Sequence, residues 1–341
     1  MKILVTGGTG FIGSHTVIEL IQSGYDPVIV DNLSNSNISV LDGIREISGK
    51  VPNFYEIDCR NREALRQVFE IEKPEAVIHF AAFKAVGESV DKPLEYYSNN
   101  IGSLAILLEI MAEFDMHNLV FSSSCTVYGQ PEQLPVTEES PDKNAASPYG
   151  YTKVVCEQMI KDVCHSKVAL KSAILRYFNP IGAHPSGIIG ELPNGVPNNL
   201  VPFITQTAIG KRDTLTVFGT DYSTPDGSCI RDFIHVVDLA KAHLAALEWL
   251  MNANTTFEIF NLGQGRGNSV IEVVKAFEAL TGEGLNYKIG PRRSGDVEQI
   301  WANVDKAERL LGWKTKLGIE EGLRDAWNWE KQLQAKEQIK S

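Results

Sequence analysis

A tyrosine and a lysine that could together handle a hydroxyl proton stand four positions apart in Tyr149-Gly150-Tyr151-Thr152-Lys153. On a helix this spacing places both side chains on one face. Because a tyrosine phenol has a pKa of about 10, it needs a nearby ammonium and a positively charged cofactor ring to act as a base near neutral pH. The pattern alone usually marks a solvated helix face. A catalytic role is favoured here because Ser122-Ser123-Ser124 ends the preceding predicted strand. The end of that strand can bring Ser124 close to Tyr149 and Lys153.

A glycine-rich turn lies between the first apolar run and the first helical stretch. Gly7, Gly10 and Gly13 form a Gly-x-x-Gly-x-x-Gly pattern within the run Thr6 to Gly13. Such a turn lets the backbone approach a pyrophosphate and directs helix amides at its charge. A tight strand-to-helix turn with no ligand would need the same residues, but the position directly after an apolar strand favours a dinucleotide site.

A carboxylate ends the second predicted strand. Asp31 follows Gly13 at the distance where such a group can accept hydrogen bonds from the adenosine ribose hydroxyls and repel a 2′-phosphate. Asn32, and not an arginine, comes next. The sequence therefore predicts NAD as the cofactor and disfavours NADP.

The elements that must position these residues read as alternating strands and helices, the pattern of a parallel sheet with helical crossovers. Predicted strands are Lys2 to Thr6, Pro27 to Asp31, Phe54 to Asp58, Ala76 to Phe80, Asn118 to Ser123 and Ala173 to Tyr177. Predicted helices are Ile12 to Ser23, Leu94 to Phe114 and Pro148 to about His165, the last beginning at a capping Ser147.

We predict an α/β fold: a Rossmann-type doubly wound parallel sheet over residues 1–180 and a smaller C-terminal α/β substrate lobe over 181–341. The boundary is approximate, and the chain can cross back between the lobes. A Gly- and Pro-rich stretch from Gly182 to Pro202 separates them and is long enough to be functional. The smaller lobe is assigned the strands Leu215 to Phe218, Ile230 to Ile234 and Phe257 to Leu262 and the helices Val236 to Met251 and Val270 to Thr281.

Composition narrows the function classes. The net charge of −11 disfavours nucleic acid as a partner, so any phosphate must be bound by local positive charge. No apolar run is long enough for a membrane span, and the N-terminal run is too short for a secretory signal. Five scattered cysteines without a Cys-x-x-Cys pair favour free thiols in a reducing cytoplasm, and the unclustered histidines make a metal site unexpected.

The chain resembles the extended short-chain dehydrogenase/reductase superfamily and, within it, the UDP-glucose 4-epimerase (UDP-galactose 4-epimerase) family. The resemblance covers nearly the whole length. It rests on Thr6 to Gly13, Asp31-Asn32 with Asn35-Ser36, His79 to Ser89, Pro93 to Tyr97, Ser122 to Gly129, Ser147 to Lys153, Arg176 to Pro180, Pro197 to Leu200 and Arg231 to His235. Together these motifs are highly specific.

The resemblance implies reversible inversion at C4 of a UDP-hexose through a transient 4-keto sugar. Tyr149 would be the base, assisted by Ser124 and Lys153, and NAD would carry the hydride and be regenerated in each cycle. The implied NAD residues are Gly7, Gly10, Phe11, Ile12, Gly13, Asp31, Asn32, Asn35, Ser36, Asp58, Cys59, Phe80, Ala81, Lys84, Asn99, Ser124, Tyr149, Lys153 and Phe178, with Tyr177 also flanking the nicotinamide. The implied UDP-sugar residues are Ser124, Tyr149, Asn179, Asn199, Leu200, Phe218, Arg231, Arg293, Asp296 and Ile300.

Departures from the family pattern gather near the sugar. Ile300 stands where some members carry a bulky tyrosine, which suggests turnover of UDP-GlcNAc and UDP-GalNAc as well. Phe233 replaces a frequent tyrosine, and Cys125 replaces a frequent small residue.

Two rival functions stay open. Nucleotide-sugar 4,6-dehydratases usually place an Asp-Glu pair where this chain has Cys125-Thr126, and a non-catalytic NAD-binding regulator would not need Ser124, Tyr149 and Lys153. The family also implies a homodimer in which the helices Leu94 to Phe114 and Pro148 to His165 pair with their copies as a four-helix bundle.

Overall fold

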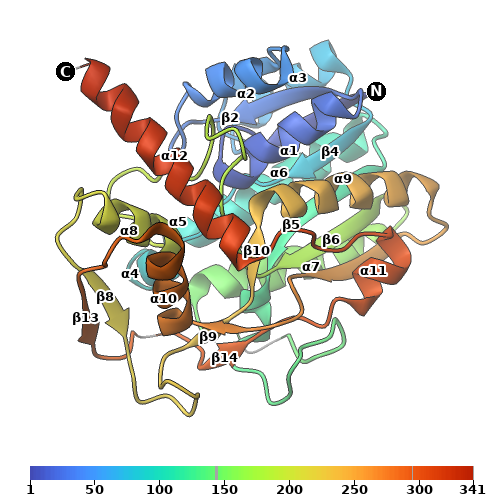
Figure 1. Ribbon diagram of the computed structural model, residues 1–341. Coiled ribbons are helices and arrows are strands. Elements are labelled where there is room, and N and C mark those ends of the chain that lie inside the picture. Colours follow the sequence, from blue (N-terminus) through green and yellow to red (C-terminus); the bar gives the residue numbers. More distant parts are fainter. Residues whose placement is uncertain (143–144, 294, 341) are drawn as a thin grey trace.

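Apolar runs without alternation form the centre of a seven-stranded parallel sheet. The computed structural model describes residues 1–341 except 143–144, 294 and 341, and the sheet has the order β11-β6-β5-β4-β1-β2-β3 (Figure 1). Its strands are β1 (Lys2–Thr6), β2 (Asp26–Asp31), β3 (Asn53–Glu56), β4 (Ala76–His79), β5 (Asn118–Ser124), β6 (Lys171–Tyr177) and β11 (Phe257–Leu262). The strand order reverses between β1 and β4, which confirms the predicted Rossmann-type fold and makes the carboxyl ends of these strands the expected ligand edge.

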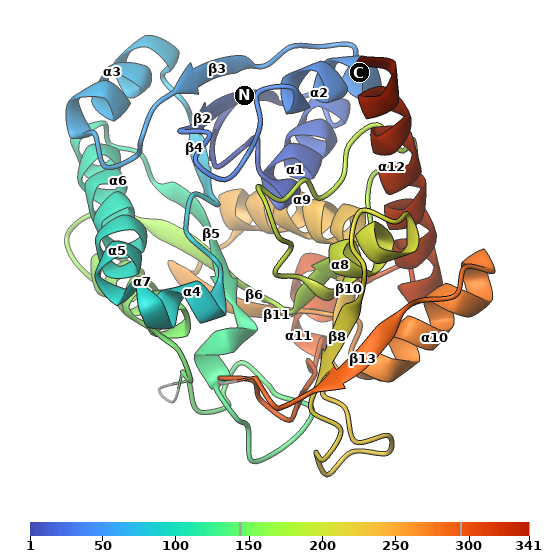
Figure 2. The same cartoon turned by 90° about the vertical axis from the view of Figure 1, so that its left-hand side faces the viewer.

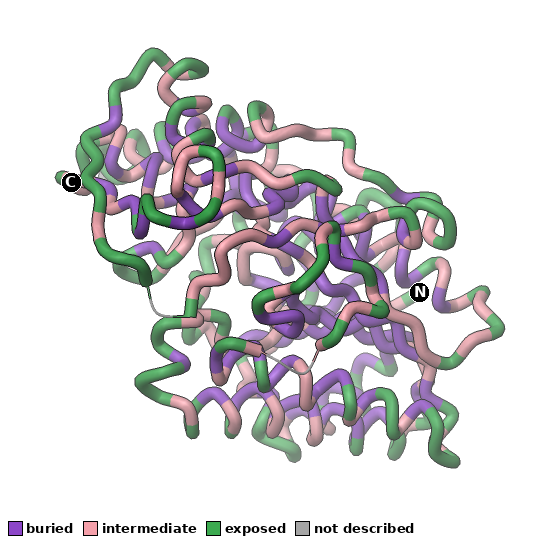
Figure 3. Tube along the Cα trace, turned by 90° about the horizontal axis from the view of Figure 1, so that it is seen from below, coloured by how far each residue is buried: buried purple, intermediate pink, exposed green. Residues whose placement is uncertain are grey.

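Helices cover both faces of this sheet. The chain places α1 (Phe11–Gln22), α2 (Val40–Ser48) and α9 (Val236–Asn252) on one face and α3 (Arg62–Glu72), α6 (Gly102–Glu113) and α7 (Pro148–Cys164) on the other (Figure 2). Successive residues of β1 divide between the two: Ile3 packs in the first layer and Leu4 in the second, and both are fully buried. Buried residues therefore run through the middle of the molecule, between exposed outer turns (Figure 3).

Residues 236–262 return to the large sheet, which corrects their assignment to the smaller lobe. Helix α9 packs against α1, and β11 pairs with β6 from Phe257 opposite Ser172 to Leu262 opposite Tyr177. Phe260 and Leu262 are fully buried in the same layer as α1. An apolar strand of this kind needs cover on both faces, and the free edge of β6 supplies that position.

In the part of the chain that the structure describes, the smaller lobe consists of short sheets and a few helices. Its strands are β7 (Asn179–Ile181) with β10 (Phe233–His235), β12 (Asn268–Ser269) with β9 (Ile230–Arg231) and β14 (Gln299–Ile300), and β8 (Leu215–Phe218) with β13 (Tyr287–Gly290). Its helices are α8 (Leu200–Ala208), α10 (Val270–Thr281) and α12 (Ile319–Lys340), while α11 (Asp305–Leu311) packs near α9.

The single strand predicted over residues 230–234 is two strands in different sheets, separated at Asp232. The Asp232 side chain is completely buried and accepts hydrogen bonds from the amides of Gln264, Gly265 and Ala302, at 2.7, 3.1 and 3.2 Å. Burial raises the pKa of this carboxyl to about 6 against the opposing effect of those amides. Asp232 thus joins three segments that a regular strand would not have brought together.

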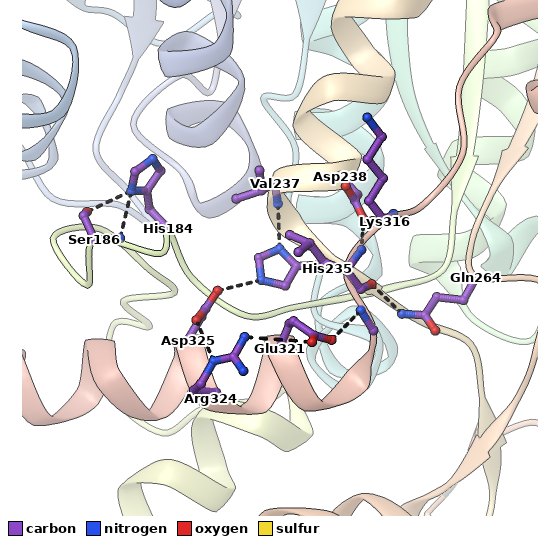
Figure 4. A network of polar contacts seen from close by, with 12 residues as sticks. His184, Ser186, His235, Val237, Asp238, Gln264, Lys316, Glu321, Arg324 and Asp325 are labelled. Atoms are coloured by element: carbon purple, nitrogen blue, oxygen red, sulfur yellow. Dashed lines mark hydrogen bonds and ion pairs between the residues drawn. The ribbon is translucent and has the colours of Figure 1, made fainter. Parts of the chain in front are cut away.

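A polar network fixes the long helix α12 to the rest of the chain (Figure 4). Nδ1 of His235 accepts from the amide of Val237, so Nε2 carries the proton and donates to Asp325 of α12 over 3.3 Å. Asp238 accepts from the amides of Lys316 and Leu317 just before that helix, at 2.7 and 2.8 Å. Among the described residues, no helix combines the length and the apolar character that crossing a membrane requires.

Replacing Gly13 with alanine tests the turn between β1 and α1. An added Cβ would lie 2.2 Å from the carbonyl oxygen of Gly7 and 2.9 Å from Cα of Gly8, so backbone must move. We expect Gly13→Ala to lower the free energy of unfolding by about 1 to 3 kcal/mol. Gly102→Ala is the control, because Gly102 has helical backbone angles and nothing within 4 Å of an added Cβ.

The control should raise stability by about 0.5 to 1 kcal/mol, as expected for a helical glycine. Denaturant unfolding of both variants measures the difference. An equal loss in the two would contradict the steric explanation.

Candidate active site

The helix that carries the tyrosine and lysine begins where the sequence predicts. The Ser147 side chain accepts from the amide of Gly150 over 3.2 Å, and Pro148 occupies the first turn of α7. An added Cβ on Gly150 would lie 3.0 Å from the carbonyl oxygen of Thr126, so glycine lets this turn approach the segment after β5. The start of α7 therefore lies against the carboxyl end of β5.

Lys153 is a buried cation beneath this edge. Its side chain is 3% exposed, and Nζ donates to the carbonyl oxygen of Ser122 over 2.7 Å and lies 4.9 Å from the centroid of the Phe121 ring. Burial lowers the pKa of Lys153 to about 8, while the nearby Cys156 and Glu157 act in the opposite direction. The ammonium form therefore depends on these few neighbours.

Tyr149 lies one turn earlier on the same face. Its side chain is 8% exposed, and burial raises the pKa of the phenol above its usual value, as does Tyr177. The Ser124 side chain lowers that pKa. Lys153 is not among the strongest influences on it, so the acidification of Tyr149 stays a prediction that depends on a bound cationic cofactor.

Ser124 ends β5 and begins a short 3-10 helix, η2 (Cys125–Tyr128). Its Oγ accepts from the amide and the hydroxyl of Thr126 at 3.2 and 3.0 Å. Two positions earlier, Ser122 forms a short hydrogen bond with Tyr177 of β6. The structure thus brings Ser124, Tyr149 and Lys153 to one edge of the sheet, as expected.

Asn99 and the unpredicted Asn100 lie in a π-helical turn, η1 (Tyr97–Ile101), inside the helix expected over residues 94–114. This stretch is α5 (Pro93–Tyr96), η1 and α6. Asn100 is 3% exposed, accepts from the amide of Phe83 at 2.8 Å and donates to Thr152 of α7 at 3.0 Å. It also accepts from Asn99 at 3.1 Å. Two adjacent asparagines inside this predicted helix were the only sequence signal for this link.

The glycine turn and Asp31 meet at the end of β2. Gly7 has φ +71°, and an added Cβ would lie 2.8 Å from the amide nitrogen of Ala81, so the β1 and β4 loops touch. Asp31 is 8% exposed and accepts from the amides of Thr9 and Leu33 and from the hydroxyl of Ser36, at 3.2, 3.0 and 3.0 Å. Helix α1 starts directly after Gly10, which has no side chain to cap its first amides. An uncapped helix end beside a carboxylate fits the pyrophosphate and ribose of a dinucleotide.

Most remaining cofactor candidates lie on the same edge. Asn32 donates to Asp58 over 3.2 Å, and Arg60 holds the pKa of Asp58 at about 2 through its hydrogen bonds. Cys59 is 5% exposed, and burial raises the pKa of its thiol to about 12. The other members are the partly buried Phe11 and Ile12 at the start of α1, the exposed Asn35 and the partly buried Phe80 in loops, and the buried Phe178.

Candidates for the nucleotide end gather in the smaller lobe. Arg293 pairs with Asp296 at 2.8 and 3.1 Å, and Arg231 lies 3.7 Å from the same carboxylate. The Arg293 guanidinium also lies 5.8 Å from the centroid of the Phe218 ring, which is 41% exposed. The two arginines can bind the phosphates of a nucleotide, and the exposed aromatic ring beside them can stack on its nucleobase.

Ile300 connects this region with the large sheet. It pairs with Arg231 across β14 and β9, is 2% exposed, and packs in one apolar cluster with Cys125 and Phe178. Asn179, at the start of β7, donates its amide to the carbonyl oxygen of Asp232 over 2.9 Å. The expected sugar residues thus lie between the two arginines and the end of β5.

Glu191 is a second polar residue that the sequence analysis missed. One oxygen of its carboxylate accepts from Asn199 at 2.6 Å and from Lys84 at 3.1 Å, although these two were expected at different ligands. Leu200 follows Asn199 as the first residue of α8. The Gly- and Pro-rich composition marked the loop that carries Glu191 as functional but pointed to no single side chain.

Comparison with known proteins gives consistent results. Residues 3–263 match the NAD dependent epimerase/dehydratase family. UDP-glucose 4-epimerase 2 of Arabidopsis thaliana is 53% identical over 331 residues, which span 96% of this chain and 94% of that protein. UDP-glucose 4-epimerase of Bacillus subtilis (strain 168) is 52% identical over 330 residues, which span 97% of each.

The fold is similar to the crystal structure of UDP-glucose 4-epimerase from Bifidobacterium longum in complex with NAD+ and UDP. The TM-score is 0.95 at 45% identity, and the match covers 97% of this chain and 98% of that one.

Asp31→Asn tests the choice of dinucleotide. Loss of the carboxylate charge weakens hydrogen bonds to ribose hydroxyls and removes the repulsion of a 2′-phosphate, so we expect the affinity ratio of NAD to NADP to fall by about tenfold or more. Titration calorimetry with each dinucleotide measures this ratio.

Asp26→Asn, at the other and exposed end of β2, is the matched control and should leave the ratio unchanged. An unchanged ratio in Asp31→Asn would show that Asp31 does not contact the ribose.

Proposed function

This chain belongs to the NAD dependent epimerase/dehydratase family, and from that premise we propose that it interconverts UDP-glucose and UDP-galactose by inverting C4 of the hexose. The observation that carries the proposal is the meeting of Ser124, Tyr149 and Lys153 at the carboxyl edge of a dinucleotide-binding sheet. Identity of 53% to a UDP-glucose 4-epimerase over almost the whole chain supports the same reaction.

NAD is the cofactor, and the glycine turn, the start of α1 and Asp31 supply groups that fit it. When bound, NAD provides the acceptor and donor of hydride that inversion of a carbon stereocentre requires. Tight retention is part of the proposal, because the reduced form must stay in place until the cycle closes. Phe178 and Tyr177, at the end of β6, are the proposed neighbours of its reactive ring.

Tyr149 moves the proton of the sugar 4-hydroxyl. As a phenolate it takes this proton, assisted by Ser124, whose side chain lowers the pKa of the phenol, and it returns the proton at the end of the cycle. The Lys153 ammonium stabilises the phenolate through its charge. Since burial alone raises the pKa of the phenol, this charge must act together with that of the oxidised cofactor.

The smaller lobe holds the nucleotide while the sugar stays free to turn. Arg231 and Arg293 offer charge to the diphosphate, and Phe218 offers a face to the base. In contrast, the surroundings of Ile300 are apolar and offer the hexose few fixed hydrogen bonds. A nucleotide clamped in this way can present either face of C4 to the same reactive site.

The two rival functions receive less support. A 4,6-dehydratase needs an acid for elimination next to Ser124, and Cys125 and Thr126 occupy that position. A regulator without catalysis has no need for a lysine kept 3% exposed beneath a buried tyrosine.

The proposed enzyme is a cytoplasmic homodimer. Five buried free cysteines suit a reducing compartment. Leu94 of α5 and Tyr151 of α7 expose 81% and 47% of their surface, which supports pairing of the α6 and α7 region with a second copy as a four-helix bundle.

Tyr149→Phe is the direct test of the reaction. Purified protein incubated with UDP-galactose and no added NAD should form UDP-glucose, and Tyr149→Phe should lower kcat by about 10² to 10⁴-fold because the proton acceptor is gone. Chromatography of the nucleotide sugars measures both.

Tyr151→Phe removes the same hydroxyl from an exposed position two residues away and should keep wild-type kcat. Wild-type protein that retains NAD but forms no UDP-glucose would refute the proposed reaction.

Ile300→Tyr tests sugar selectivity. Because the isoleucine leaves more room than tyrosine, we propose that the chain also interconverts UDP-GlcNAc and UDP-GalNAc. The variant should lose at least about tenfold of kcat/KM on this acetylated pair and stay within about twofold on UDP-galactose.

Cys229→Ser is the control, because Cys229 is buried in the smaller lobe and is not among the proposed sugar contacts. It should change kcat/KM for neither the acetylated pair nor UDP-galactose. If wild-type protein showed no detectable turnover of UDP-GlcNAc or UDP-GalNAc, the proposed activity on the acetylated pair would be refuted.

A further inference from the structure

Three successive serines at the end of β5 meet three successive turns of α7. Ser124 lies close enough to Tyr149 to lower the pKa of its phenol, the carbonyl of Ser122 accepts from Lys153, and the hydroxyl of Ser123 donates to Glu157 in a short bond. The three α7 residues are spaced four apart, so they share one face of the helix. The first two contacts belong to the proposed active site, and the third has no role in it.

Glu157 is held on its far side by a fully buried arginine. Nε and Nη2 of Arg176, on β6, donate to the Glu157 carboxylate at 2.9 and 2.5 Å. Nη2 also donates to Asp142 at 2.6 Å, and the guanidinium lies 4.9 Å from the centroid of the Tyr128 ring. Glu157 is 5% exposed and Arg176 is 0% exposed.

We propose that Glu157, clamped between Ser123 of β5 and Arg176 of β6, is a positioning residue for the reaction: it fixes the register of α7 on the sheet and so holds Lys153 and Tyr149 against Ser122 and Ser124. This inference rests on the proposed epimerase activity. It adds a residue, two turns beyond the base, that touches neither substrate nor cofactor.

A role in stability alone does not explain the arrangement. Removing two charges from water costs so much that a buried ion pair often stabilises a fold no more than well-packed apolar residues of the same volume would. Apolar side chains, however, can slide past one another, whereas a carboxylate with three fixed donors has one position that satisfies them all. A slip of α7 by a fraction of a turn would break these bonds together with the bond from Lys153 to Ser122.

The Glu157 charge has a second effect, on Lys153. The carboxylate raises the pKa of Lys153, which burial lowers to about 8. Besides Tyr149, the phenol that this charge would stabilise, the ionisable groups that interact with the ammonium are Cys156 of α7 and His79 of β4. Burial lowers the pKa of His79 to about 3 and raises that of Cys156 to about 12, so both are neutral near pH 8 and Glu157 is the nearby negative charge.

Glu157→Gln tests the inference, because it keeps an acceptor of similar shape and removes the charge. We expect kcat for UDP-galactose to fall by about tenfold or more with KM within about twofold. Without the carboxylate the pKa of Lys153 falls, so the alkaline limb of the kcat profile should move to lower pH by about half a unit or more. Hydrogen exchange of the α7 amides should rise over residues 149–157 in the same variant.

Ile160→Ala is the matched control: it creates a cavity one turn further along α7, where the fully buried Ile160 carries no charge. It should destabilise the protein and leave the alkaline limb in place. Should Glu157→Gln fail to fold, Ser123→Ala, which removes one of the hydrogen bonds and keeps the ion pair, should show a smaller fall of kcat and the same rise in α7 exchange.

A folded Glu157→Gln protein with wild-type kcat, pH profile and α7 exchange would overturn the inference, as would the same pH shift in Ile160→Ala. Failure of the proposed function itself would look different, because the wild-type protein would then be inactive while α7 exchange still responded to Glu157→Gln.

Discussion

The structure depends on keeping one ammonium charged where water hardly reaches it. Lys153 is 3% exposed, and burial moves its pKa toward the physiological range. A lysine in such a place stays protonated only if fixed dipoles and charges replace the lost water. The carbonyl of Ser122, the face of Phe121 and the carboxylate of Glu157 provide this replacement, and all three depend on how α7 lies on β5 and β6.

The same requirement explains why the two lobes are interleaved and not merely adjacent. The chain leaves the large sheet after β6, forms the first strands of the smaller lobe and returns through α9 and β11 before leaving again. Asp232 lies just before that return and accepts hydrogen bonds from the amide of Gln264, directly after β11, and from the amide of Ala302, near Ile300. Glu191 bridges Lys84 of the large lobe and Asn199 of the smaller one. The residues proposed to bind the cofactor and those proposed to bind the sugar are therefore held in place by the same polar side chains.

Local signals in the sequence were sufficient for much of this arrangement. The sheet strands up to β6, the glycine turn and the capped start of α7 each depend on residues within a few positions of one another, and the structure confirms them. Asn100, Glu157 and Glu191 were missed because their partners lie far along the chain, at Thr152, Arg176 and Lys84. The return of residues 236–262 to the sheet was placed in the wrong lobe, since an apolar strand does not reveal which sheet edge it will join.

The most direct test of the central claim is the pKa of the Tyr149 phenol in protein that retains NAD. Ultraviolet difference titration of wild type against Tyr149→Phe isolates the phenolate absorbance of this one residue. The account predicts ionisation well below the usual pKa of about 10, despite the burial that raises it in the chain alone. A phenol that ionises at or above that value with the oxidised cofactor bound would contradict it.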